Sequence, residues 1–209
     1  GDRKGEIDLV RIRIHADDPA GPDGADKTNA FSKPSPGILW EKQFGQGAFQ
    51  ESLYYITTCG GQWWWDPADG EAMPRDDAQI WQLDFLIDAT EAFLQDGSEQ
   101  APRVYWLAVE VDATGGQFGW KTRRWPEHFM DEAVWDLGSK APRPWQSLRY
   151  PKGHPYYDSQ QNSIDLAFCL ISGSQDLEPP VTSRPATVTY CPALETMCPA
   201  STTKCPAMV

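Results

Sequence analysis

Residues 103–122 constrain the fold more than any other part of the chain. In an extended backbone, alternate residues counted from Val104 and from Tyr105 fall on opposite faces, and both faces are apolar as far as Glu110. Strands of this kind are usually covered on both sides of a sheet. The pattern therefore predicts a central strand of a packed sheet, followed by a tight turn at Gly115 and Gly116 and a second strand.

Other strands are predicted where apolar and polar residues alternate or where apolar residues cluster, at residues 7–14, 37–44, 48–58, 79–88 and 163–171. Turn-rich loops separate these segments, and the chain's 18 prolines and 17 glycines are typical of such punctuation. We therefore expect an all-β domain over residues 1–175. Its most fitting architecture is an antiparallel β-sandwich that resembles a jelly roll.

The overall charge limits the classes of partner. The formal net charge is −12 at pH 7, whereas a protein that binds nucleic acid needs a basic surface for the phosphates. The sequence also contains no apolar run of the roughly 18 residues that a transmembrane helix requires. We therefore expect no nucleic-acid partner and no transmembrane segment.

An acidic loop is predicted within residues 17–36, where Asp17, Asp18, Asp23 and Asp26 lie among glycines and prolines. Clustered carboxylates are ligands for calcium, but their spacing here differs from the twelve-residue calcium loop between two helices. We interpret the segment as a solvated acidic loop and keep a calcium site as the alternative.

Three consecutive tryptophans form the densest aromatic stretch. In an extended strand Trp63 and Trp65 share one face, and together with Trp125 they are candidates for a platform that stacks sugar rings. The other interpretation is that these rings complete the core, because large aromatic side chains are usually buried.

A seven-residue repeat occupies the C-terminal tail. After a linker rich in proline, serine and threonine at residues 176–188, residues 189–209 repeat Thr-x-Cys-Pro-Ala and place Cys191, Cys198 and Cys205 at equal spacing. Proline at every seventh position excludes a coiled coil, so we expect an extended tail.

The repeated thiols have three interpretations. They form disulfides between chains, bind a soft metal such as Cu(I) or zinc, or pack within the tail. Closely spaced cysteine pairs, which are typical of zinc sites, are absent from the repeat. The chain has five cysteines, an odd number, and this favours a structural or cross-linking tail.

Nine blocks in order along the chain resemble one family, and they are residues 36–40, 44–49, 79–87, 92–97, 104–107, 118–122, 131–135, 148–155 and 163–168. The chain resembles an uncharacterised family of secreted proteins from environmental bacteria and archaea, filed as a domain of unknown function. The resemblance covers about residues 7–172. It implies secretion and a β-sandwich-like domain, and it carries over no catalytic residues.

The resemblance also implies a further strand-rich segment before the counterpart of Ile7. Two interpretations follow: the N-terminal segment is missing from this sequence, or a neighbouring subunit supplies the strand. The second would leave an open sheet edge that favours polymerisation by strand addition.

No motif for an enzyme stands out. The densest titratable cluster joins Glu127 and His128 to Asp131 and Glu132, and the chain lacks the sequence signatures of a serine hydrolase, a zinc protease or a phosphate loop. We therefore predict a secreted, non-enzymatic structural protein of an extracellular or cell-surface assembly, such as a filament. It would be joined by strand addition, by the cysteine tail, or by both. The alternative is an extracellular carbohydrate-binding module.

Overall fold

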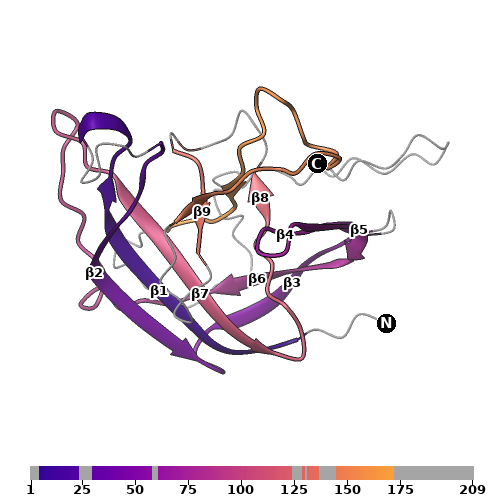
Figure 1. Ribbon diagram of the computed structural model, residues 1–209. Coiled ribbons are helices and arrows are strands. Elements are labelled where there is room, and N and C mark those ends of the chain that lie inside the picture. Colours follow the sequence, from indigo (N-terminus) through magenta and orange to yellow (C-terminus); the bar gives the residue numbers. More distant parts are fainter. Residues whose placement is uncertain are drawn as a thin grey trace.

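The computed structural model describes residues 5–23, 30–57, 61–123, 129, 131–136 and 145–171, and these residues form a mostly β protein (Figure 1). Every strand pair among them is antiparallel, with one three-stranded sheet and four two-stranded pairs. Within this part of the chain the only helical element is one 3-10 turn at Gly21–Asp23. The all-β prediction is confirmed in this form, as several antiparallel sheets.

The largest sheet has β1 (Glu6–Asp18) at its centre, between β2 (Lys33–Gly45) and β7 (Tyr105–Thr114). The prediction that residues 103–122 supply the central strand is wrong, because among the described residues β7 pairs with β1 alone. The second apolar face of β7, on which Trp106 lies, is therefore not explained by a second paired strand among the described residues. Trp106 on that face donates a hydrogen bond from its indole Nε1 to Asp17 Oδ1, 2.7 Å away.

One face of this sheet is apolar and forms the first core. Val10, Ile12 and Phe44 are its buried residues. Phe49, which precedes β3, and Phe85, which follows β6, pack against them, and the ring centroids of Phe44 and Phe85 lie 5.0 Å apart. Burial of each such side chain contributes about 1.5–3 kcal/mol, so this cluster holds the β3–β6 pair against the large sheet.

An irregular segment between β6 and β7, residues 85–104, contacts both β2 and β7. Trp40 on β2 donates a hydrogen bond from Nε1 to the carbonyl oxygen of Glu91 at 2.7 Å. The Phe93 ring meets Tyr105 on β7 edge to face at 5.1 Å. The Tyr105 hydroxyl also donates to the carbonyl oxygen of Asp96 at 2.9 Å. These contacts tie the segment to both outer strands of the sheet.

The opposite face of the sheet is charged. Arg11 forms ion pairs with Glu110 at 3.2 Å and Asp112 at 3.0 Å, and Arg13 forms ion pairs with Glu41 at 2.5 Å and Glu110 at 2.8 Å. The hydrogen bond from Arg13 holds the pKa of Glu41 below its usual value. Opposite charges on neighbouring strands stabilise the register of β1 between its two partners.

Two further antiparallel pairs lie between β2 and β7 in the chain (Figure 1). β3 (Gln50–Ile56) pairs with β6 (Gln79–Asp84), and β4 (Gln62–Asp66) pairs with β5 (Glu71–Asp77). In the first pair Ile80 is the buried residue.

Short strands build the C-terminal half of the described chain. β8 (Thr122–Arg123) pairs with β11 (Asp165–Leu166), and β9 (Val134–Trp135) pairs with β10 (Gln146–Ser147). They surround a second core, whose buried members are Ala133, Leu148, Tyr150 and Ile164.

Two predicted strands are shorter than expected. After Gly116 the chain does not return along β7, because β8 covers only two residues and pairs with β11. Of residues 163–171 only Asp165–Leu166 forms a strand, and Leu170 and Ile171 are 70% and 87% exposed. These last apolar side chains therefore lie beyond the core that Ile164 enters.

The finer architecture remains a prediction. Among the described residues the pairings show no closed sandwich and no jelly roll. The linker and the repeat tail, residues 176–209, lie outside the described residues. Within the part of the chain that the structure describes, no helix has the length and apolar character needed to cross a membrane.

Candidate functional site

An exposed apolar stretch lies on β3, and β2 carries a shorter one at Ile38 and Leu39, which are 51% and 50% exposed. Leu53, Tyr54 and Ile56 are exposed by 44%, 51% and 50%, and we call these three residues the β3 surface. Single exposed apolar residues are common on proteins, whereas three within four residues of one strand form a patch, and such patches are typical of interaction sites.

Among the described residues β3 pairs with β6 alone. Its register with β6 pairs Leu53 with Trp81 and Tyr55 with Ile80, and Tyr54 is the extra residue of a β-bulge. A bulge bends the strand and interrupts its regular alternation. The apolar run at residues 53–56 is therefore not drawn into the core, although Ile80 across the pair is buried.

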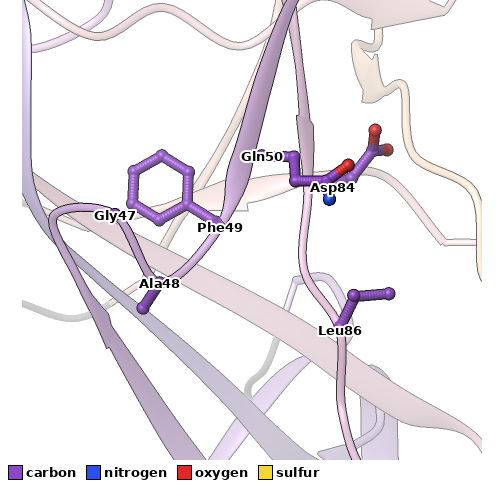
Figure 2. A pocket seen from close by; sticks show the side chains of 6 residues that line it. All are labelled: Gly47, Ala48, Phe49, Gln50, Asp84 and Leu86. Carbon is purple, nitrogen blue, oxygen red and sulfur yellow. The ribbon is translucent and has the colours of Figure 1, made fainter.

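A small hollow lies where β3 begins and β6 ends. It measures about 200 Å³ and is lined by Gly47, Ala48, Phe49, Gln50, Asp84 and Leu86 (Figure 2). Gly47, with φ of 78°, makes the turn that enters β3. The single ionisable group of this lining, Asp84, accepts a hydrogen bond from Gln82 Nε2 at 2.7 Å. One carboxylate offers no acid–base pair, so the hollow resembles a seat for an apolar side chain more than a catalytic pocket.

A second cluster surrounds His154. Its imidazole stacks on Tyr150 with ring centroids 4.6 Å apart, and Trp63 and Tyr156 meet it edge to face at 5.2 and 5.4 Å. The side chain is only 8% exposed, and burial lowers its pKa from 6.5 to about 4. The imidazole is therefore neutral at pH 7.

The hydrogen bonds of His154 define its tautomer. Its Nδ1 accepts the backbone N–H of Tyr156 at 3.1 Å, so the proton of the neutral ring is on Nε2. Its backbone N–H also donates to the Pro151 carbonyl oxygen at 3.0 Å. These bonds fix the ring as a packing element between β4 and the second core.

The predicted aromatic platform is partly engaged inside the protein. Trp63 contacts His154, and Trp65 packs against the second core, with its indole Nε1 buried. Both side chains are half-buried. Trp125 lies outside the described residues, so sugar stacking stays a prediction.

The described carboxylates of the predicted acidic loop, Asp17 and Asp18, lie in different environments. Asp17 accepts the Trp106 hydrogen bond, and burial raises its pKa, with a smaller contribution from nearby Asp131. Asp18 lies 3.9 Å from Lys33 Nζ. The Asp23 side chain and Asp26 lie outside what the structure describes. In the described residues no group of three or more potential ligands is arranged to hold a metal ion.

The predicted titratable cluster is likewise only partly described. Glu132 accepts hydrogen bonds from Ser147 Oγ at 2.8 Å and from Arg149 Nη2 at 2.5 Å. Glu127 and His128 lie outside the described residues. Glu132, just before β9, therefore forms an ion pair with Arg149, just after β10.

One of the five cysteines lies among the described residues. Cys169 is free and exposed. Cys191, Cys198 and Cys205 lie outside the described residues, so the three interpretations of the tail stay predictions.

Sequence reasoning missed two features. It gave no packing role to His154, although the neighbouring Tyr150 and Tyr156 signal an aromatic cluster. It also assigned β3 as a strand without indicating that its apolar residues face solvent. The signal for that exposure was weak, since only Gln50, Glu51 and Ser52 mark the strand as polar.

Comparison with known proteins gives one match. A family described as Domain of unknown function (DUF7901) matches residues 1–171. Searches of curated proteins and of solved structures gave no significant match. The matched range contains every described residue and ends before the linker and the repeat tail.

Proposed function

The chain belongs to the family described as Domain of unknown function (DUF7901), and from this premise we propose that it is a non-enzymatic structural subunit that self-associates outside the cell. The observation that carries the proposal is the β3 surface, with Leu53, Tyr54 and Ile56 each 44–51% exposed on one strand. A strongly acidic protein that keeps such a strand uncovered has a surface suited to another protein.

The tail supports a second kind of contact. Cys191, Cys198 and Cys205 recur at one period, and a covalent link between chains would use them. Two thiols would exchange with a small-molecule disulfide such as oxidised glutathione, forming one protein disulfide and releasing two reduced thiols. This chemistry requires an oxidising compartment, which agrees with the secretion that the family resemblance implies.

Two finer features belong to the same proposal. The cell surface or extracellular space is the proposed location, supported by the resemblance to secreted proteins and by the redox requirement of the tail. The sandwich arrangement is supported by the packing of Phe49 and Phe85, at the ends of the β3–β6 pair, on the apolar face of the large sheet. Strand addition at an open edge remains part of the proposal.

Carbohydrate binding has weaker support. Trp63 and Trp65 both contact the protein's own side chains, which favours a role in packing over a flat exposed platform.

The test of the proposed function is the assembly state of the purified full chain. We would examine it by electron microscopy and sedimentation velocity, once with oxidised glutathione and once with a reductant. We expect regular polymers under oxidising conditions that shorten on reduction. Dispersed monomers in both conditions would contradict the proposal, and binding of polysaccharides by wild type and Trp63→Ala would then be measured.

A further inference from the structure

We propose that the β4–β5 pair is a flap that docks on the second core through the contact of Trp63 with His154 and is released when that imidazole gains a proton. The flap consists of residues 62–77, and its release uncovers Trp63 and Trp65. The inference is independent of the proposed self-assembly. It gives the buried histidine a regulatory role.

Side chains attach the flap to the second core. The backbone hydrogen bonds of β4 and β5 join these strands to each other, and among the described residues none reaches the second core. Trp63 meets the His154 ring edge to face at 5.2 Å, and Trp65 packs against the core. Lys121 Nζ donates a hydrogen bond to Gln62 Oε1. The flap can therefore leave without breaking a described backbone bond to the core.

The segment that carries His154 is attached more firmly. The backbone N–H of Tyr150 donates to the carbonyl oxygen of Asn162 at 2.8 Å, and that of Leu148 donates to Ala133 at 2.9 Å. Tyr150 and Leu148 are also buried members of the second core. When the contact between the two parts opens, we therefore expect the flap to move and His154 to stay with the core.

The docked flap leaves two polar groups unsatisfied. The indole Nε1 atoms of Trp64 and Trp65 are buried, and neither has a hydrogen-bond acceptor in the structure. A buried N–H donor without an acceptor lowers stability, because water would accept its hydrogen bond in an open state. Docking therefore depends on the remaining contacts, and the loss of one of them favours release.

The docked arrangement requires a neutral His154. Its Nδ1 accepts the backbone N–H of Tyr156 at 3.1 Å, whereas an imidazolium carries a hydrogen on both ring nitrogens. Protonation would therefore set two donors against each other. His15 is buried to the same degree, but its Nδ1 donates to the carbonyl oxygen of Ser35 at 2.9 Å. Both the neutral and the charged ring can make that bond, so of the two histidines His154 is the one that loses a hydrogen bond on protonation.

The surroundings of His154 do not compensate a positive charge. The titratable side chains in ring contact with it are Tyr150 and Tyr156, which are phenols and offer no carboxylate. Burial outweighs the attraction of the Tyr150 ring for a cation, since it lowers the pKa of His154 and no charged group is among the causes. The described charged residues on β4, β8, β11 and beside the histidine are Asp66, Arg123, Asp165, Arg149, Lys152 and Asp158.

The direction of the pH response follows from proton uptake. With the flap docked, His154 binds a proton near pH 4, and with the flap open and the ring in water it binds one near its ordinary pKa of 6.5. Opening therefore takes up a proton between these values and becomes more favourable as the pH falls. From pH 7 to pH 5 the ratio of open to docked flap should rise about twentyfold.

The experiment is hydrogen exchange of the full chain with a reductant present, at pH 7 and pH 5, after correction for the intrinsic exchange rate at each pH. The amides of the flap and of β1 are followed separately, because β1 lies in the large sheet and reports unfolding of the whole domain. In wild type the flap should open more often than β1 at both pH values, and its opening should rise about twentyfold at pH 5.

Two variants test the role of the ring. His154→Phe keeps an aromatic ring that cannot gain a proton, so the flap should open to nearly the same extent at both pH values. His15→Asn is the matched control, because it removes the other buried histidine and keeps an N–H donor for Ser35. It should show the wild-type response. Should His154→Phe fail to fold, His154→Asn replaces it, since its amide oxygen can accept the Tyr156 N–H.

Three results would overturn the inference. The first is flap opening that is equal at pH 7 and pH 5 in wild type, and the second is a response of His154→Phe as large as that of wild type. The third is a flap that opens only as often as β1, which would mean that the domain unfolds as one unit. Each of these would leave self-assembly untouched, because the redox test of the proposed function decides that question separately.

Discussion

At the scale of single residues, His154 makes the clearest link between packing and chemistry. Three aromatic rings meet around it, and it has no charged partner among the causes of its lowered pKa, since burial alone accounts for that shift. A proton added to this ring would place a charge in a site built for a neutral side chain. The stability of the second core should therefore depend on pH.

We predict that His154 makes the protein less stable as the pH falls from about 6.5 to about 4. In the unfolded chain the imidazole binds a proton near its ordinary pKa of 6.5, while in the folded protein it does so only near 4. Between these pH values the unfolded state binds more protons than the folded state. The free energy of unfolding therefore decreases as the pH is lowered, by about 3 kcal/mol at most.

His154→Phe tests this prediction by keeping an aromatic ring and removing the titration. Urea unfolding at pH 7 and pH 5 should show a smaller loss of stability for the variant than for wild type. Between pH 7 and 8 the two proteins should respond alike, which serves as the control. Equal losses between pH 7 and 5 would show that carboxylates, and not His154, govern acid sensitivity.

At the scale of elements, the last predicted strand shows how a sequence pattern and a structure diverge. Every second residue from Ile164 to Leu170 is large and apolar, which places them on one predicted face, yet only Asp165–Leu166 is a strand. Ile164 is 1% exposed, whereas Leu170 is 70% exposed. The two aliphatic residues belong to the same predicted face but have opposite environments, because the second core ends before Leu170.

We predict that Ile164→Ala destabilises the protein by about 2–5 kcal/mol, since it removes buried methyl groups and leaves a cavity. Leu170→Ala should change stability by no more than about 0.5 kcal/mol, because that side chain is already in water. Chemical unfolding of both variants measures the difference. Similar losses in the two variants would mean that the strand continues to Ile171.

The same comparison explains what could be predicted from sequence. The sequence was sufficient to predict four strands, β1, β2, β3 and β6, because alternation of apolar and polar residues marks a half-buried strand. Alternation does not give strand order, so β7 was placed at the centre in place of β1. The two-residue strands near the second core are too short for any period. The β3 surface and the Trp63–His154 contact depend on a bulge and on residues distant in sequence, and a local pattern reports neither.

At the scale of the whole molecule, we expect the described chain and the repeat tail to have separate roles. The described residues of both hydrophobic cores lie between Ile7 and Leu166, and the family match ends at residue 171. Among the described residues, neither core includes a residue after Leu166. The stability of the domain should therefore be independent of the tail, and the tail should matter for association alone.

A chain that ends at residue 175 tests this separation. Under reducing conditions its unfolding midpoint in circular dichroism should lie within about 2 °C of the full chain, because both cores are retained. Under oxidising conditions it should form no disulfide-linked polymers, while the full chain polymerises. The full chain with Cys191, Cys198 and Cys205 replaced by serine should behave as the truncated one does. If the truncated chain instead melts more than about 5 °C lower, the tail packs on the domain and the division between a folding unit and a linking unit is wrong.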